Sequence, residues 1–149
     1  MAGRAACWVL AVSVLLSSLP ALAELGGDEG SVQADAMQMK AQRRIERTQA
    51  YVMHEMHTPP GTVVREYVSS SGKVFAVSWQ GPTTPDFRQL LGAYYDQLQN
   101  AQLTRNERGP LLIHQPGLVF HSGGHMRAFS GRAYIPDMVP AGVALEAIR

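Results

Sequence analysis

Five histidines carry much of the chemistry that this sequence offers, and four of them form two closely spaced pairs. The first pair, His54 and His57, flanks Glu55 in the stretch YVMHEMH. A zinc-protease helix places its histidines at i and i+4, with a glutamate after the first, so that both ligands share one face. His54 and His57 are three positions apart, and in a strand this separation turns two side chains to opposite faces. The stretch therefore predicts a half-buried strand. Its alternation groups Tyr51, Met53, Glu55 and His57 on one face and Val52, His54 and Met56 on the other.

The second pair, His121 and His125, encloses the sequence Ser-Gly-Gly, which is typical of a tight reversal. Two residues that flank such a hairpin loop lie opposite each other, with Cβ atoms about 5 Å apart. Because imidazole is a good ligand for zinc, copper and nickel, the pair is the better candidate for a metal site. His114 is a third candidate ligand if it lies on a neighbouring strand. The alternative is that exposed hairpin ends simply carry polar residues.

Catalysis has a weaker basis in this sequence. Glu55 and Glu66 are the carboxylates of the strand region, and they could act as a general acid and base in a small hydrolase. Both are also typical of solvent-facing strand positions, where Arg65, Lys73 or Arg127 would neutralise them across strands. The chain has no G-x-S-x-G nucleophile motif. Arg127 and Arg132 could bind an anion, although in a chain of balanced charge they are typical surface residues. We therefore expect no catalytic residue and no cofactor.

The first residues have the features of a cleavable secretory signal. Arg4 precedes an apolar run that ends at Leu19, Pro20 breaks the helix, and the small residues Ala21 and Ala23 occupy the positions that signal peptidase reads. The run is shorter than the ~20 apolar residues of a membrane-spanning helix. We therefore expect residues 1–23 to be removed and the protein to be exported to the periplasm or outside the cell.

Removal of this segment changes the charge and the thiol content. Cys7, the single cysteine, would be lost, so neither a disulfide nor a thiol nucleophile is expected in the mature chain. Arg4 would be lost as well, which brings the 13 basic residues level with the 12 acidic ones. A neutral chain gives no electrostatic reason to expect nucleic acid or an anionic membrane as the partner. No later stretch is long and apolar enough to be an integral membrane segment.

The remaining sequence predicts one α+β domain over residues 32–149, after a glycine-rich and flexible stretch at 24–31. Residues 32–49 are good helix formers without Gly or Pro, and they predict an N-terminal helix. Residues 51–57, 62–69 and 73–80 are rich in β-branched and aromatic side chains and are joined by turn sequences, so they predict a three-stranded antiparallel meander. The third of these strands is apolar on both faces, which predicts a central position.

The second half of the chain supplies the main helix and the other strands. Thr84 and Pro85 form a helix start, followed by one apolar stripe at Phe87, Leu90, Leu91, Tyr94 and Leu98. This amphipathic helix is expected to cover one face of the sheet. Residues 111–114, 118–121 and 126–134 predict the C-terminal hairpin strands, and residues 135–149 a loop with one helical turn near Leu145.

Two stretches of the sequence resemble a known family. They are Thr62–Gly92, which contains VREYVS, VFAVSWQGP, PDF and LLG, and Ser122–Ala133, with SGGHMRAFSGRA. The chain resembles domain of unknown function 2844, a family of small exported proteobacterial proteins. The resemblance implies a bacterial, exported, single-domain protein and supplies no activity, cofactor or catalytic residue.

Taken together, these features favour a non-enzymatic binding or accessory module of the cell envelope. Its partner is expected to be an envelope protein that contacts an exposed strand edge or the sheet face left uncovered by the main helix. The alternative is a histidine-based metal-binding protein that uses His121, His125 and His114. The weaker alternative is the hydrolase built on Glu55 or Glu66.

Overall fold

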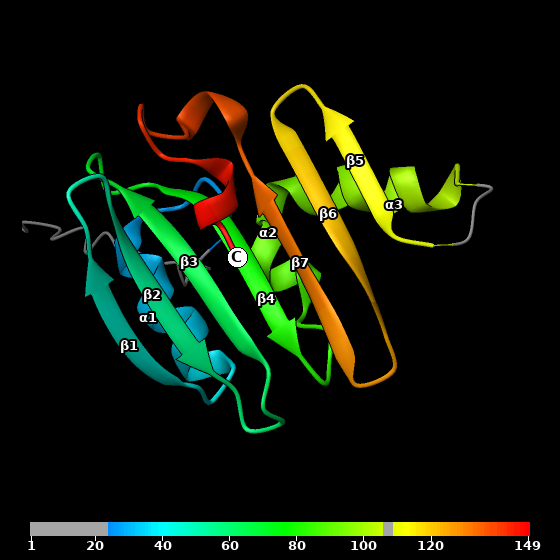
Figure 1. Ribbon diagram of the computed structural model, residues 1–149, viewed down its shortest axis with the longest axis horizontal. Coiled ribbons are helices and arrows are strands. Elements are labelled where there is room, and N and C mark those ends of the chain that lie inside the picture. Colours follow the sequence, from blue (N-terminus) through cyan, green and yellow to red (C-terminus); the bar gives the residue numbers. More distant parts are fainter. Residues whose placement is uncertain (1–23, 106–108) are drawn as a thin grey trace, which may run out of the picture.

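The computed structural model describes residues 24–105 and 109–149, and the predicted signal at 1–23 lies outside the described residues. Its centre is a seven-stranded antiparallel sheet in the order β1-β2-β3-β4-β7-β6-β5. The strands are β1 (Gln42–Arg47), β2 (Tyr51–His57), β3 (Val63–Ser69), β4 (Val74–Gly81), β5 (Leu111–Gln115), β6 (Leu118–His125) and β7 (Ala128–Tyr134). The helices α1 (Glu29–Gln38), α2 (Phe87–Leu91) and α3 (Tyr95–Leu103) lie behind the sheet in Figure 1. The predicted α+β class is confirmed.

Strands β2, β3 and β4 form the predicted meander. His54 lies opposite Glu66, which in turn lies opposite Val77, so one row of side chains crosses the three strands on the same face. All residues of β4 from Val74 to Trp79 are buried, because this strand has a neighbour on each side and apolar cover on both faces. The predicted central position of this strand is confirmed.

The N-terminal helix is shorter than predicted, and its expected second half is strand β1. Helix α1 ends in a Schellman motif in which Ala41 N donates to Ala36 O at 2.8 Å and Lys40 N donates to Met37 O at 3.1 Å. Lys40 takes the left-handed conformation that this motif requires, with φ at 52°. The next residues then pair with β2 over Gln42–Arg47. Pairing with β2 therefore outweighs the helix propensity of this arginine-rich and glutamate-rich segment.

Residues 24–31, which the glycines predicted to be flexible, pack against the sheet instead. The side chain of Leu25 is buried, and Gly26 N donates to Val74 O at 2.8 Å. Asp28 pairs with Lys73 through a backbone bridge and through a 2.8 Å ion pair between their side chains. This short stretch joins the start of α1 to the start of the central strand β4.

The main helix has the predicted apolar stripe but is divided into two parts. Asp86, and not Thr84, is its N-cap, because the Asp86 carboxylate accepts hydrogen bonds from Arg88 N at 2.9 Å and Gln89 N at 3.3 Å. A 3₁₀ turn, η1 (Gly92–Tyr94), separates α2 from α3. At Gly92 a Cβ atom would collide with the Glu24 side chain, and φ is 48°. The Glu24 side chain thus packs against Gly92 at the point where the helix is interrupted.

The C-terminal hairpin turns later than predicted. Strand β6 continues through Ser122, Gly123 and Gly124 to His125, and the reversal is the two-residue turn Met126–Arg127. Gly124 at φ 122° comes so close to β7 that a Cβ atom would lie 2.2 Å from Ala128 O. Gly124 therefore serves close contact with β7, and both glycines belong to strand β6 and not to the turn.

The two faces of the sheet have different cover. The helix face, which carries Met56, Val64 and Trp79, packs against the three helices. The opposite face, here called the open face, carries Tyr67 and Tyr134 and packs against the C-terminal segment, residues 135–149. This segment contains the 3₁₀ turns η2 (Pro136–Met138) and η3 (Leu145–Ala147), and it lies in front of the central strands in Figure 1. Only part of the open face is covered in this way. Among the described residues, no helix is both long and apolar enough to cross a membrane.

The left-handed conformation of Lys40 gives a test of how α1 ends. We expect Lys40→Gly to raise the free energy of unfolding by about 0.5–1 kcal/mol, because glycine adopts positive φ without the Cβ clash. Urea unfolding followed by circular dichroism measures the change. Lys40→Ala is the matched control, since it removes the same charge but keeps Cβ. Equal stabilisation by both variants would contradict the assignment.

Candidate functional site

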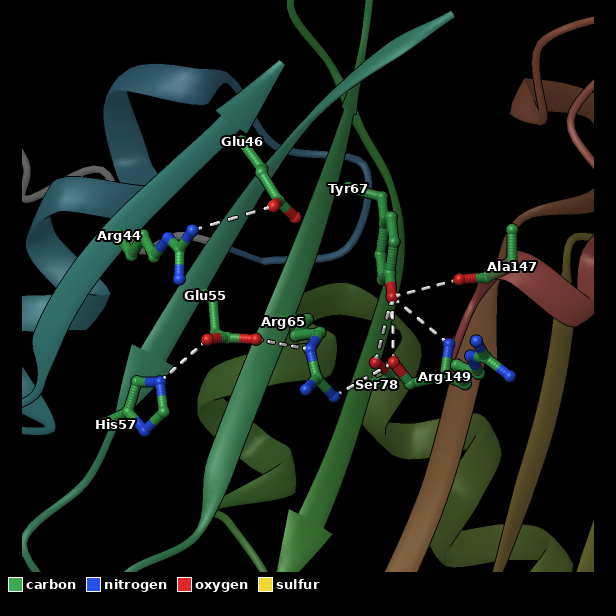
Figure 2. Close-up of polar contacts among 9 residues, drawn as sticks. All are labelled: Arg44, Glu46, Glu55, His57, Arg65, Tyr67, Ser78, Ala147 and Arg149. Atoms are coloured by element: carbon green, nitrogen blue, oxygen red, sulfur yellow. Dashed lines mark hydrogen bonds and ion pairs between the residues drawn. The ribbon is translucent and has the colours of Figure 1, made fainter. Parts of the chain in front are cut away.

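A row of hydrogen-bonded side chains crosses the open face from β2 to β3 (Figure 2). His57 Nε2 lies 2.8 Å from Glu55 Oε1, and Arg65 Nε donates to Glu55 Oε2 at 2.8 Å. The Arg65 guanidinium also donates from Nη1 to the backbone oxygen of Arg149 at 3.0 Å. This row therefore connects strands β2 and β3 to the C-terminal segment.

Glu55 is an ionised anchor in this row. The hydrogen bond to His57 lowers the pKa of Glu55 below its ordinary value of 4.5, and the neighbouring Arg65 guanidinium lowers it further. A general acid must hold a proton near neutral pH, so its pKa has to be raised. The environment of Glu55 instead lowers its pKa, which disfavours that role. Its position suits charge pairing across strands, which is the alternative that the sequence offered.

Tyr67 and Arg132 hold the C-terminal segment on the open face. The Tyr67 hydroxyl accepts a hydrogen bond from Arg149 N at 3.2 Å and donates to Arg149 O at 3.1 Å (Figure 2). Arg132 Nη1 donates to the backbone oxygens of Leu145 and Ile148. Ile148 is buried between these anchors. Arg132, which the sequence marked as an anion candidate or a surface charge, is thus also a structural residue.

A cavity of about 450 Å³ adjoins the anchored segment on the side of β5 and β6. Apolar side chains of Leu112 and Ile148 line it together with the polar side chains of Gln80 and Ser130. The lining also includes two arginines, Arg132 and Arg149, and the histidine His121. None of the described lining residues is Asp or Glu. The described wall of the cavity is therefore partly apolar and carries positive charge.

Two histidines meet at the rim of this cavity. His114 on β5 and His121 on β6 point their Nε2 atoms at each other at a distance of 2.9 Å, with ring centroids 5.0 Å apart. The strand register places Leu112 opposite His121 and Val119 opposite His114, so both imidazoles lie on the open face. Burial lowers the pKa of His121, and the nearby His114 and Arg132 lower it further.

A second cluster of ionisable groups is sealed under α1 on the helix face. Asp35 and Glu66 are 0% and 1% exposed, and Gln89 Nε2 donates to Asp35 Oδ1 at 2.7 Å. Burial, the negative charge of Asp35 and a hydrogen bond to Asp35 raise the pKa of Glu66 well above 4.5.

Buried His54 completes this cluster. Its Nε2 lies 3.2 Å from Glu29 Oε1, and its Nδ1 lies 3.5 Å from the Arg43 guanidinium. Burial lowers the pKa of His54, and the positive charge of Arg43 adds to this effect. With Glu66 and Asp35 almost fully buried, the cluster offers no surface to a substrate and is a structural feature.

The structure separates several residues that the sequence grouped together. His121 and His125 lie four positions apart on one strand, so the prediction that they face each other across a hairpin is wrong. Glu55 and Glu66 lie on opposite faces, so they cannot act as one acid–base pair. The faces predicted for YVMHEMH are confirmed, with His54 and Met56 buried on the helix face and His57 exposed. Among the described residues, no three His, Cys, Asp or Glu side chains converge as a metal site.

Comparison with known proteins identifies one family. The family model described as "Protein of unknown function (DUF2844)" matches residues 21–148, which is nearly the whole chain. No curated protein and no solved structure matches the chain.

The raised pKa of Glu66 predicts how stability depends on pH. Above pH 4.5 the unfolded chain loses the Glu66 proton while the folded protein keeps it, so wild-type stability falls as pH rises toward the folded-state pKa. Glu66→Gln removes this titration. We therefore expect the stability of wild type relative to the variant to fall by up to about 1.4 kcal/mol per pH unit over part of the range between pH 5 and 8.

Urea unfolding of both proteins across this pH range measures the difference. Glu55→Gln is the matched control on the open face, because the lowered pKa of Glu55 leaves both states ionised at these pH values. The assignment fails if the stability curves of wild type and Glu66→Gln run parallel.

Proposed function

The chain belongs to the DUF2844 family, whose description gives no activity, and we propose from the geometry that it is a non-enzymatic binding module of the bacterial cell envelope. The N-terminal signal pattern supports export to the periplasm or the cell exterior. The binding surface in this proposal is the cavity on the open face, next to the C-terminal segment.

One observation carries this proposal, namely the described lining of the cavity. A volume of about 450 Å³ is typical of small-molecule sites, which combine apolar walls with a few polar groups that fix orientation. Here the apolar part is supplied by Leu112 and Ile148 and the positive charge by Arg132 and Arg149. This combination fits an anion with an apolar body, such as a carboxylate on an alkyl chain or an acidic side chain of an envelope protein.

The hydrolase alternative loses its basis in the positions of its two carboxylates. Glu55 is held ionised between His57 and Arg65, and Glu66 is sealed beneath α1. The hollow that Glu55 lines together with Arg44, Glu46 and Met53 measures about 80 Å³. That volume is well below the roughly 300 Å³ at which ligand sites begin. Neither carboxylate therefore supports a hydrolase.

Metal binding by histidines is a second candidate function, favoured by a specific observation. His114 and His121 bring two ligand atoms within 2.9 Å of each other at an accessible strand edge. His125, the other histidine of the expected site, lies at the far end of β6 beside the turn. The candidate therefore rests on His114 and His121.

Titration with two amphiphiles of opposite charge tests the cavity proposal. We expect decanoate to bind and to shift the backbone NMR signals of Leu112, Ser130 and Arg132, while decyltrimethylammonium, which has an alkyl chain of similar length, binds far more weakly. Arg149→Gln should weaken decanoate binding about tenfold, or by ~1.4 kcal/mol, because it removes one of two positive charges at the site. The backbone bonds of Arg149 to Tyr67 remain possible in this variant.

Arg44→Gln is the matched control, since Arg44 lies on the open face at β1 and does not line the cavity. It should leave the affinity unchanged. Equal binding of both amphiphiles, or equal effects of the two arginine substitutions, would overturn the proposal.

A further inference from the structure

The contact between His114 and His121 has the geometry of an incomplete metal site. Their Nε2 atoms are 2.9 Å apart, and no backbone lies between them because the two residues are diagonal neighbours on adjacent strands. His114 is exposed on β5, which is the last strand of the sheet. An ion can therefore approach the pair from solvent without any change in the fold.

The distance between the two nitrogens indicates which coordination geometry fits. Two nitrogens bound at about 2.0–2.1 Å to one ion lie about 2.9 Å apart when the angle at the ion is 90°, and about 3.4 Å apart when it is tetrahedral. Right-angle coordination is the preference of copper(II) and nickel(II), whereas structural zinc is tetrahedral. The 2.9 Å separation of the His114 and His121 Nε2 atoms matches the value for a 90° angle at the ion.

We propose that His114 and His121 form a two-histidine copper(II) site at the rim of the open-face cavity. This inference rests on the second candidate function and names its ion and its ligands. Both imidazoles bind through Nε2 in adjacent positions of a square arrangement. The other positions are open to water or to a carboxylate bound in the cavity, which His121 also lines.

Two features of the surroundings bear on this site. Arg132 lies opposite His121 on β7, and its positive charge opposes binding of a cation. Its Nη1 group, however, donates to the backbone oxygens of Leu145 and Ile148, which directs the guanidinium toward the C-terminal segment. The second feature is that 2.9 Å also fits an N–H···N hydrogen bond between neutral imidazoles. A bound ion takes the place of that shared proton.

Copper titration of the purified protein tests the site, with the polyhistidine tag removed so that the tag cannot bind the ion. We expect one equivalent of copper(II) per chain, with an electron paramagnetic resonance spectrum of tetragonal copper and two equivalent imidazole nitrogens. His114→Ala and His121→Ala should each weaken binding about tenfold or more and remove one nitrogen from the spectrum. Circular dichroism of the variants without metal checks that the sheet is intact.

His125→Ala and His57→Ala are the matched controls, because both residues are exposed histidines outside the pair. They should leave affinity and spectrum unchanged. If wild type binds no copper, both the second candidate function and this inference fail. If copper binds but is lost in His125→Ala and retained in His114→Ala, metal binding stands and the assignment of the site is overturned.

Discussion

Strand β4 imposes the constraint on which the rest of the structure depends. Its residues from Val74 to Trp79 are buried on both faces, so each face of the sheet needs an apolar cover. On the helix face, the Trp79 ring packs 4.9 Å from Phe87 and 5.4 Å from Phe120, measured between centroids. On the open face, the Phe75 ring lies 6.2 Å from that of Tyr67. Aromatic side chains bury 150–250 Å² each, so these contacts dominate the core.

The second cover explains why polar side chains gather on the open face. The C-terminal segment has little regular secondary structure, and its backbone groups need partners when they are brought against a sheet. Arg65, Tyr67 and Arg132 supply hydrogen bonds to its carbonyl oxygens. Arg65 and Tyr67 are held by the fold in this way and are poor candidates for chemistry, whereas Arg132 also lines the cavity. The imidazoles of His114 and His121 make no such bond to the segment, and their contact is with each other.

The sequence predicted what depends on local alternation and missed what depends on distant pairing. The faces of YVMHEMH follow from period two, which any strand obeys, and the order of strands β2 to β4 follows from turn chemistry. Strand β1 was missed because its Gln, Arg and Glu residues favour helix, and only its partner β2 makes it a strand. The meeting of His114 and His121 depends on the register of β5 with β6. A reversal placed at Ser122–Gly124 made His125 the expected partner of His121 instead, because Gly124, which lies in close contact with β7, resembles a turn glycine.

Helix α1 shows how buried polar groups can obscure which face of a helix packs against the sheet. Its buried stripe is Ser31, Val32, Asp35 and Ala36, at the spacing of a helical face but half polar. Apolar contacts by Val32 and Ala36 alone would allow α1 to rotate about its axis at modest cost. The hydrogen bond from Gln89 to Asp35 fixes this rotation, and it also joins α1 to α2 across the helix face. Two negative charges buried side by side at Asp35 and Glu66 would cost much free energy. Glu66 therefore keeps its proton to higher pH, which is why its pKa is raised. The same buried carboxyl groups that orient α1 thus make its attachment to the sheet dependent on a proton.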